Sequence, residues 1–220
     1  MSILAREKAY PVLKRMCLEY MFWPRQQLLI EELAARMSFS TTPVREALAR
    51  LAGEELIEAI PSRGYFAKPL CGEEMRWNID FLFMLLRYVV ENYNISRSWQ
   101  TSYCLNFSED KATLGISDDL FLRIAKMDNT PAMVVQMKRS LDITRFVRRI
   151  DLEDASSDAA LKNSLLELQT HLNGGDIEAV IQCLGRLQSD LKQKTPALIR
   201  EARIRVGNPG NASVFNGVFE

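Results

Sequence analysis

The chain has 220 residues, and its 28 Lys and Arg equal its 28 Asp and Glu, so the formal net charge is zero. This balance excludes a general electrostatic attraction to nucleic acid, and any DNA-binding function would need a local basic surface. With a single histidine, the chain also lacks the side chains that most transition-metal centres and acid–base catalysts require.

The first predicted element is a helix over residues 3–23, whose apolar side chains form one stripe at Tyr10, Leu13 and Cys17. Pro24 is expected to end this helix, because proline disfavours a helical conformation in the residue before it. A second, short helix follows, with apolar residues every four positions at Leu29, Leu33 and Met37.

A third helix is predicted to begin after the hydroxyl-rich stretch at residues 40–42. Its apolar residues have the i, i+3, i+4, i+7 spacing of one helical face: Val44, Ala47, Leu48 and Leu51. Thr42 is expected to be the N-cap, with Pro43 at the first helical position, where its missing N–H costs nothing. The second and third helices should therefore pack together through their apolar stripes.

The exposed face of the third helix is predicted to carry Thr42, Arg45, Ala49 and Arg50. A helix with threonine and arginine at its N-terminal turn can hold a DNA phosphate, and Arg45 can reach a guanine edge. Recognition helices enter the major groove in this way. The alternative is that Arg45 and Arg50 are solvated ion-pair partners of Glu46 and Glu54.

Two short strands are predicted next, at residues 56–60 and 65–68, around a turn of Pro61, Ser62, Arg63 and Gly64. The turn places a basic residue, Arg63, beside a glycine. A hairpin directly after a candidate recognition helix is typical of a winged helix-turn-helix domain, so this hairpin favours DNA reading over the ion-pair alternative.

Residues 13–68 resemble the winged helix-turn-helix of GntR-family transcriptional regulators. The likeness lies in Glu32-Leu33-Ala34, in Ser40-Thr41-Thr42-Pro43-Val44-Arg45-Glu46-Ala47-Leu48 and in Pro61-Ser62-Arg63-Gly64. The resemblance implies that Thr42 and Arg45 contact DNA from the recognition helix, with Ser40 at its N-terminal turn. It also implies that Arg63 and Gly64 form the wing tip. We include Thr41 and Arg50, on the same helix, among the candidate DNA contacts.

The chain departs from the family pattern at three positions. Thr41 stands where the family usually has arginine, and Arg25 and Glu55 stand where it usually has glycine. The change at Thr41 implies that the operator sequence differs from the usual one, while DNA binding itself is retained.

From residue 73 onward the pattern becomes helical, and we place a domain boundary near Leu70, which gives domains 1–70 and 71–220. The first helix of the second domain is predicted over residues 73–98. Apolar side chains cover most of its circumference, so it should be buried on several sides. Either it runs through the centre of its own domain, or it packs on its own core and on a second subunit at once.

Four more helices are predicted, at residues 118–127, 131–150, 155–172 and 176–206. Thr130-Pro131 and Gly175-Asp176 are the expected starts of two of them. The predicted fold class is mainly α. A winged helix-turn-helix of three helices and a small β-hairpin should precede an all-α bundle of about five or six helices.

The helical half resembles the ligand-responsive C-terminal domain of the FadR-like branch of the GntR family, through Arg87 with Glu91, Asp118 to Phe121, and Gly175-Asp176. Many members of that branch hold a divalent metal with one aspartate and three histidines. In this chain the histidine positions are occupied by Leu122, Leu165 and Leu187, and only Asp118 remains. We therefore predict no bound metal and no cofactor.

The sequence does not indicate an enzyme. A catalytic nucleophile needs an adjacent base that is itself oriented by a third group, and one histidine leaves few ways to build such a set. The neighbouring Asp118 and Asp119 would point about 100° apart on a helix, which does not suit a paired acid. A solvated or N-capping pair is the preferred interpretation.

The replaced histidines should leave a dry, apolar cavity, with Arg87 as its fixed positive charge and Asp118 as a second candidate effector-binding residue. An arginine fork in an apolar pocket favours a carboxylate, so we expect a small organic acid as effector. In the alternative, Arg87 pairs with Glu91 and the cavity is filled by Trp77, Phe81 and Met84. The regulator would then have no small-molecule input.

The four cysteines lie far apart, without the two-residue spacing of zinc or redox sites, and are expected to be reduced. The N-terminal residues mix charged and apolar side chains, and the longest apolar run, from Phe81 to Leu86, has only six residues. We therefore expect a cytoplasmic protein without a membrane partner.

Three functions fit these patterns: a ligand-responsive transcription regulator, a winged-helix module for protein contacts, and a metabolite-binding or enzymatic helical protein with an accessory N-terminal domain. The polar residues on the predicted recognition helix favour the first, because a protein-contact face would be apolar. We expect a homodimer that binds double-stranded operator DNA, with repression as its mode of action.

Overall fold

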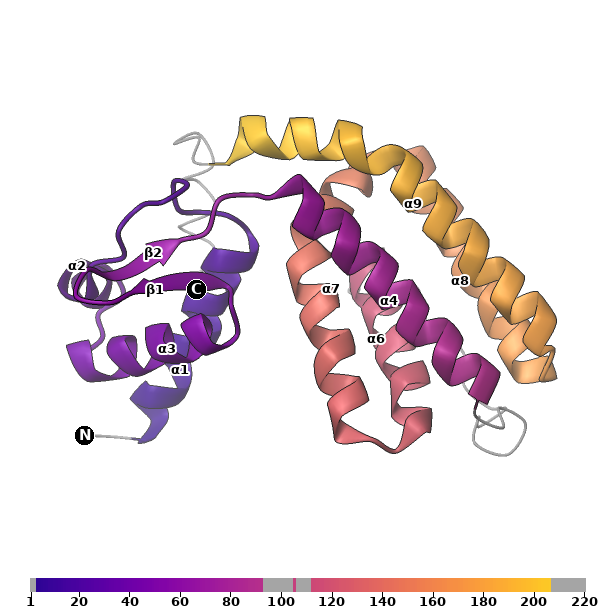
Figure 1. Ribbon diagram of the computed structural model, residues 1–220, viewed down its shortest axis with the longest axis horizontal. Helices are drawn as coiled ribbons and strands as arrows, with labels where there is room; N and C mark the ends of the chain where they lie inside the picture. The colour runs from indigo at the N-terminus through magenta and orange to yellow at the C-terminus, as the bar shows by residue number, and fades with distance from the viewer. Residues whose placement is uncertain (1–2, 93–104, 106–111, 207–220) are drawn as a thin grey trace. The chain divides into compact units, whose positions relative to one another are not determined.

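The computed structural model describes residues 3–92, 105 and 112–206. The chain divides into two compact units, of which the first contains Met1–Cys71 with Arg200–Glu220 and the second contains Gly72–Ile199. The architecture is mainly helical, with one two-stranded hairpin after the N-terminal helices (Figure 1). The predicted fold class is therefore confirmed.

The first unit is built from α1 (Ile3–Leu18), α2 (Ile30–Arg36), α3 (Thr41–Gly53), β1 (Ile57–Ile60) and β2 (Gly64–Ala67). α1 packs across α3, and α2 also packs against α3 (Figure 1). The core uses the predicted stripe of α3 together with side chains from α1 and α2: Leu13, Met16, Leu33, Val44, Leu48 and Leu51.

Three local predictions in this unit are wrong. α1 ends at Leu18 and not at residue 23. Tyr20 takes a positive φ of 49°, and the N–H groups of Tyr20 and Met21 bond back to Cys17 and Met16 as in a Schellman motif. This closure ends the helix six residues before Pro24, without the glycine that usually marks it.

The other two corrections concern α2 and α3. Leu29, predicted on the apolar stripe of the second helix, is 40% exposed, and Leu28 is buried instead. The reason is that α2 begins only at Ile30, so Leu29 is its N-cap residue and has an extended conformation. The N-cap of α3 is Ser40 and not Thr42, so Thr42 and Pro43 lie within the first helical turn. Pro43 is still tolerated there, since the first turn has no intrahelical acceptors for its N–H groups.

The hairpin pairs β1 with β2 in antiparallel register, from Ile57 opposite Ala67 to Ile60 opposite Gly64. Ser62 and Gly64 both have positive φ, 61° and 95°. The segment before α2 extends this sheet, because Leu28 N–H bonds to the Tyr65 carbonyl at 2.8 Å.

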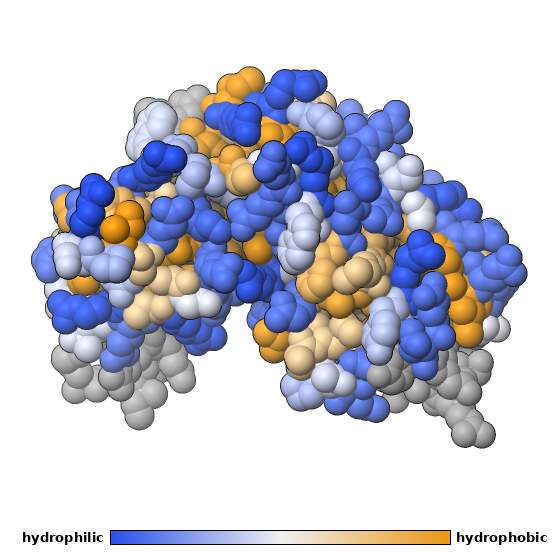
Figure 2. All heavy atoms as spheres, viewed as in Figure 1, coloured by the Kyte–Doolittle hydropathy of each residue, from blue (hydrophilic) through white to orange (hydrophobic). Residues whose placement is uncertain are grey.

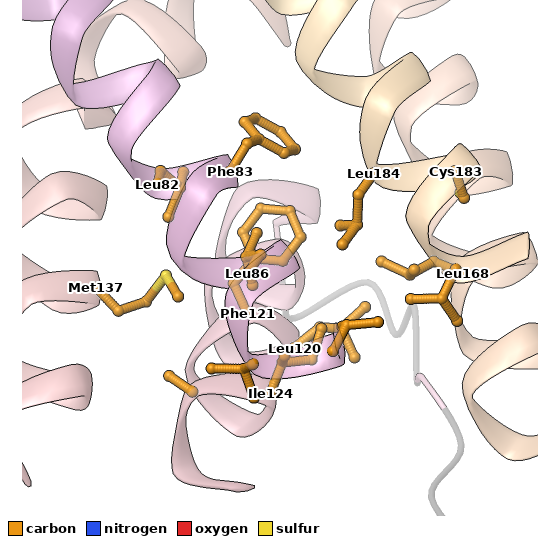
Figure 3. Packing of buried hydrophobic residues seen from close by; sticks show 14 of the residues in the cluster. Leu82, Phe83, Leu86, Leu120, Phe121, Ile124, Met137, Leu168, Cys183 and Leu184 are labelled. Atoms are coloured by element: carbon orange, nitrogen blue, oxygen red, sulfur yellow. The ribbon is translucent and has the colours of Figure 1, made fainter. Parts of the chain in front are cut away.

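The second unit contains α4 (Gly72–Asn92), α6 (Thr113–Ala125), the short 3-10 helix η1 (Lys126–Asp128), α7 (Pro131–Asp151), α8 (Ala155–Gly174) and, as far as Ile199, α9 (Ile177–Arg205). The part predicted as helix beyond Asn92, residues 93–98, lies outside the described residues. The helices share one core to which each long helix contributes (Figure 3), with Leu82 and Phe83 from α4, Phe121 from α6, Met137 from α7 and Leu168 from α8.

Several helix ends in this unit follow the predicted capping residues. Thr130 is the N-cap of α7 with Pro131 directly after it. Gly175 has φ of 70° at the end of α8, and the Asp176 carboxylate accepts a hydrogen bond from Ala179 N–H at 3.1 Å. α6, by contrast, begins at Thr113 and not at Asp118, because Leu114 and Ser117 are buried and form its first turn.

α4 has two apolar faces, of which one is buried and the other is exposed. One face is buried in the core of its own unit, including Ile79, Leu82 and Leu86. The other face carries large side chains that remain exposed, with Trp77 at 61%, Met84 at 55% and Tyr88 at 48%. In the space-filling view, apolar residues gather over α4 between hydrophilic ones (Figure 2).

Candidate nucleic-acid interface

The outer face of α3 presents the predicted groove-reading residues together. Thr41, Thr42 and Arg45 are all exposed, while the opposite face, with Val44 and Leu48, is fully buried. The Ser40 side chain makes no capping hydrogen bond, so the first N–H groups of α3 remain available to an acceptor from outside. A phosphate oxygen is such an acceptor, and the helix dipole favours its charge.

Arg45 and Arg50 differ in their surroundings. Arg45 makes no ion pair within the part of the chain that the structure describes. Arg50 bonds through Nε to Glu54 Oε1 at 3.1 Å, and its guanidinium lies 3.7 Å from the centre of the Tyr10 ring. Arg45 is therefore poised for an external partner, whereas Arg50 also links α3 to α1.

A polar cluster joins the C-terminal end of α3 to α1. Glu54 accepts hydrogen bonds from Tyr10 Oη at 2.6 Å and from Lys14 Nζ at 2.9 Å, in addition to the bond from Arg50. Partial burial raises the pKa of Glu54, but the hydrogen bonds and the positive charge of Lys14 outweigh burial, so this pKa is lowered. Burial, followed by the bond to Glu54, raises the pKa of Tyr10.

The hairpin turn is held by a side chain that the sequence did not single out. Gln27 Nε2 donates to the Arg63 carbonyl oxygen at 2.8 Å, so the segment before α2 fixes the backbone of the turn. The Arg63 side chain is exposed, and its guanidinium lies 5.6 Å from the centre of the Phe66 ring. A glutamine in a loop carries no periodic signal, and only the fold brings Gln27 to Arg63.

A cavity of about 270 Å³ lies in the second unit. Its apolar lining comes from four helices and includes Leu82, Phe83, Leu114, Phe121, Leu161 and Leu187. The buried Arg148 lines it as well and bonds to Asp118 Oδ1 at 2.6 Å. Asp118 is thus the anchor of a cavity arginine and is not itself part of the lining.

Arg87, the other predicted effector residue, lies outside this lining. Its side chain is 46% exposed, and its Nη2 lies 3.6 Å from Glu91 Oε1, as the alternative interpretation had it. Trp77 and Met84, which were to fill the cavity in that alternative, are exposed instead. The buried arginine of the cavity lining is Arg148, which sequence reasoning missed, and Asp151, Arg186 and Asp190 line the cavity as well.

The three leucines at the positions of the replaced histidines lie in apolar surroundings. Leu165 is buried, Leu122 packs against the core, and Leu187 lines the cavity. Among the described residues, no group of three or more His, Cys, Asp and Glu could hold a metal ion. The same residues include no helix that is long and apolar enough to cross a membrane.

Comparison of the sequence with known proteins finds similarity in the first unit. Residues 5–66 match the sequence model of the bacterial regulatory proteins of the gntR family. A 55-residue segment is 40% identical to the Nta operon transcriptional regulator of Aminobacter aminovorans. That segment is 25% of this chain, and the match spans about a quarter of the relative's length.

Two solved structures share the fold across both units. The structure of Lar, described as controlling expression of the Listeria monocytogenes agr system, aligns with a TM-score of 0.64 at 12% identity, covering 90% of this chain and 99% of that one. A transcriptional regulator described as GntR, from Rhodococcus sp. RHA1, aligns with a TM-score of 0.66 at 15% identity, covering 87% and 97%. At these identities the likeness concerns the fold alone.

Proposed function

Starting from a GntR-family domain at its N-terminus, we propose that this chain is a sequence-specific transcriptional regulator. Residues 1–70 form its DNA-binding domain, and residues 71–220 form a FadR-like domain for effector binding and dimerisation. The protein binds operator DNA as a homodimer, acts as a repressor, and works in the cytoplasm, where its operator is. The matched family consists of regulatory proteins, which agrees with a function other than catalysis.

The arrangement of α3 is the observation that carries this proposal. Its buried face fixes the helix in the domain, and its outer face presents Thr41, Thr42 and Arg45 without an ion-pair partner for Arg45 among the described residues. Arg45 would read a guanine edge, and the two threonines with the helix N-terminus would hold the adjacent phosphates. The exposed Arg63 and Gly64 would contact the neighbouring backbone, and Arg50 retains a 63% exposed side chain for a phosphate contact.

The outer face of α4 supports the homodimer. Trp77, Phe81, Met84 and Tyr88 follow one another at helical spacing, and the Trp77 and Phe81 rings stack with their centres 4.8 Å apart. Large apolar side chains gathered on one helix face are typical of interaction surfaces. A two-fold dimer would place two recognition helices on two half-sites of an operator.

The test is a fluorescence-anisotropy titration with duplex DNA from upstream of the protein's own gene, with a scrambled duplex of equal length as control. We expect tighter binding to the upstream duplex and an affinity for both that falls as salt increases, because phosphate contacts release counterions. Equal affinity for the two duplexes, or binding that ignores salt, would show that the winged helix serves another purpose, such as protein contacts.

A further inference from the structure

The cavity of the second unit combines apolar walls with two pairs of opposite charges. Arg186 and Asp190 line it from α9, where they pair with Glu167 and Lys194, and the other two charges lie on α7. Arg148 and Asp151 both line it from α7, and they are one helical turn apart, a rise of about 4.5 Å. Leucine and phenylalanine side chains from α4, α6, α8 and α9 form most of the remaining surface. An apolar space with a few converging polar groups is the usual form of a small-molecule site.

Arg148 is fixed in place before any ligand arrives. Its side chain is buried, with Nε bonded to Thr144 Oγ1 at 3.1 Å, Nη1 to Asp118 Oδ1 at 2.6 Å and Nη2 to the Leu141 carbonyl at 2.9 Å. A guanidinium has five N–H groups, so these three bonds leave one N–H on each of Nη1 and Nη2. A carboxylate is the group that best accepts such a pair of hydrogen bonds.

Asp151 supplies the opposite charge. Its side chain is only 14% exposed, and its described ion-pair partner, Lys194 Nζ, stands 3.6 Å away, beyond the length of a good hydrogen bond. Lys194 makes shorter contacts with Asp190, at 2.8 Å, and with Ser157, at 3.2 Å. A largely buried carboxylate is stabilised by further donors, and an ammonium group offers three of them.

We infer that this cavity binds a free α-amino acid with a hydrocarbon side chain, with its carboxylate on Arg148, its ammonium on Asp151 and its side chain among the leucines. The one-turn separation of the two residues suits a ligand whose two charges are one carbon apart. A dry cavity of about 150 Å³ is enough for benzene. The volume of about 270 Å³ therefore accommodates a leucine or phenylalanine molecule.

The zwitterion is preferred over either of its halves. A simple carboxylic acid would use only the N–H groups that the three bonds of Arg148 leave, and a simple amine would use only the Asp151 carboxylate. A ligand that carries both charges makes both contacts, so it should bind more tightly than one that carries a single charge. This inference rests on the effector-responsive part of the proposed function and names the class of its effector.

The experiment uses the full chain and two matched sets of probes, studied by isothermal calorimetry. One set is L-leucine, 4-methylpentanoate and 3-methylbutylamine, and the other is L-phenylalanine, 3-phenylpropanoate and 2-phenylethylamine. We expect at least one amino acid to bind about tenfold or more tightly than its acid or its amine. No binding by either amino acid, or equal affinity for the acid and the amino acid, would overturn the inference on wild-type protein alone.

A pair of variants locates the site. Asp151→Asn should lose the preference for the amino acid over the acid, while Glu153→Gln should keep it, because Glu153 is 43% exposed, pairs with Arg149 and does not line the cavity. An unchanged preference in Asp151→Asn would remove Asp151 from the role. The operator titration on the same preparations separates the two claims: operator binding without amino-acid binding rejects this inference only, and absence of operator binding rejects the proposed function.

Discussion

At the scale of single residues, Arg45 tests the proposed DNA-reading surface most directly. Replacing it with alanine should reduce specific operator binding by about 1 to 3 kcal/mol, the usual value of a bidentate base contact. The free energy of unfolding should stay within about 0.5 kcal/mol of wild type, because the side chain is exposed. Anisotropy titrations and urea denaturation measure the two quantities.

Arg15→Ala is the matched control for this variant. Arg15 is an exposed arginine of the same unit, on α1 and outside α3, so its loss changes the net charge equally. It should affect specific and scrambled duplexes alike, and only slightly. If Arg45→Ala and Arg15→Ala behave in the same way, Arg45 reads no base.

Glu54 gives a residue-scale prediction about pH. Despite partial burial, the bonds from Tyr10 and Lys14 hold its pKa below the ordinary value, so its ionised form is favoured in the folded state. The resulting stability is present above the ordinary pKa of about 4.3 and is lost as the pH falls through the lowered folded value. Glu54→Gln should therefore cost about 1 kcal/mol of unfolding free energy at pH 7 and progressively less below pH 4.

The measurement is urea denaturation of both proteins between pH 3 and pH 7. Glu58→Gln, an exposed carboxylate on β1, serves as the control and should show a smaller difference at every pH. A constant gap between wild type and Glu54→Gln across this range would show that the charge of Glu54 is not what joins α1 to α3.

At the scale of elements, the wing depends on the backbone at Gly64. Its φ of 95° is a conformation that L-residues rarely adopt, while a Cβ there would meet nothing closer than Gln27 Nε2 at 3.9 Å. Gly64→Ala should thus be destabilising through backbone strain, by about 1 to 2 kcal/mol, and should weaken operator binding by displacing Arg63.

Gly53→Ala is the control for Gly64→Ala, because a Cβ at Gly53 would meet open space and Gly53 lies at the end of α3. Gly53→Ala should be neutral in both assays, and equal behaviour of the two variants would contradict the strain argument.

Helix ends show which parts of the elements a sequence can predict. Thr130 and Pro131 mark the start of α7, because proline is favoured at the first helical position and disrupts a helix at later ones. The end of α1 carries no such mark, since its left-handed residue is Tyr20 and not glycine, and Pro24 three residues after Met21 is the stronger signal in the sequence. Local chemistry predicts an end only where the capping residue is of the usual type.

The candidate sites differ in the same way. Thr42, Arg45 and Arg63 are close in sequence, and one short motif contains them, so their placement in one unit could be predicted. Arg148 could not be found, because it lies among Arg145 and Arg149 on α7, and no spacing shows which arginine is buried. Its ion-pair partner, Asp118, lies on another helix and 30 positions away in the sequence.

At the scale of the whole molecule, the second apolar face of α4 is the surface on which the proposed homodimer depends. The helix packs on the core of its own unit on one side only, so the remaining face either meets water or meets a second copy. Burying Trp77 and Met84 in a dimer would contribute at most about 1.5 to 3 kcal/mol for each side chain, which favours association.

The double variant Trp77→Glu/Met84→Glu should therefore be a folded monomer by light scattering, because both side chains are exposed in the single chain and two charges per subunit would face each other across the interface. Its operator affinity should fall by about 10² to 10⁴, since one chain can then occupy only one half-site and the gain from linked binding is lost.

Val135→Glu is the control, because Val135 is an apolar residue on α7 that is 61% exposed, as Trp77 is on α4. It should remain a dimer with wild-type affinity. A dimeric double variant that still binds its operator tightly would place the subunit contact elsewhere on the molecule.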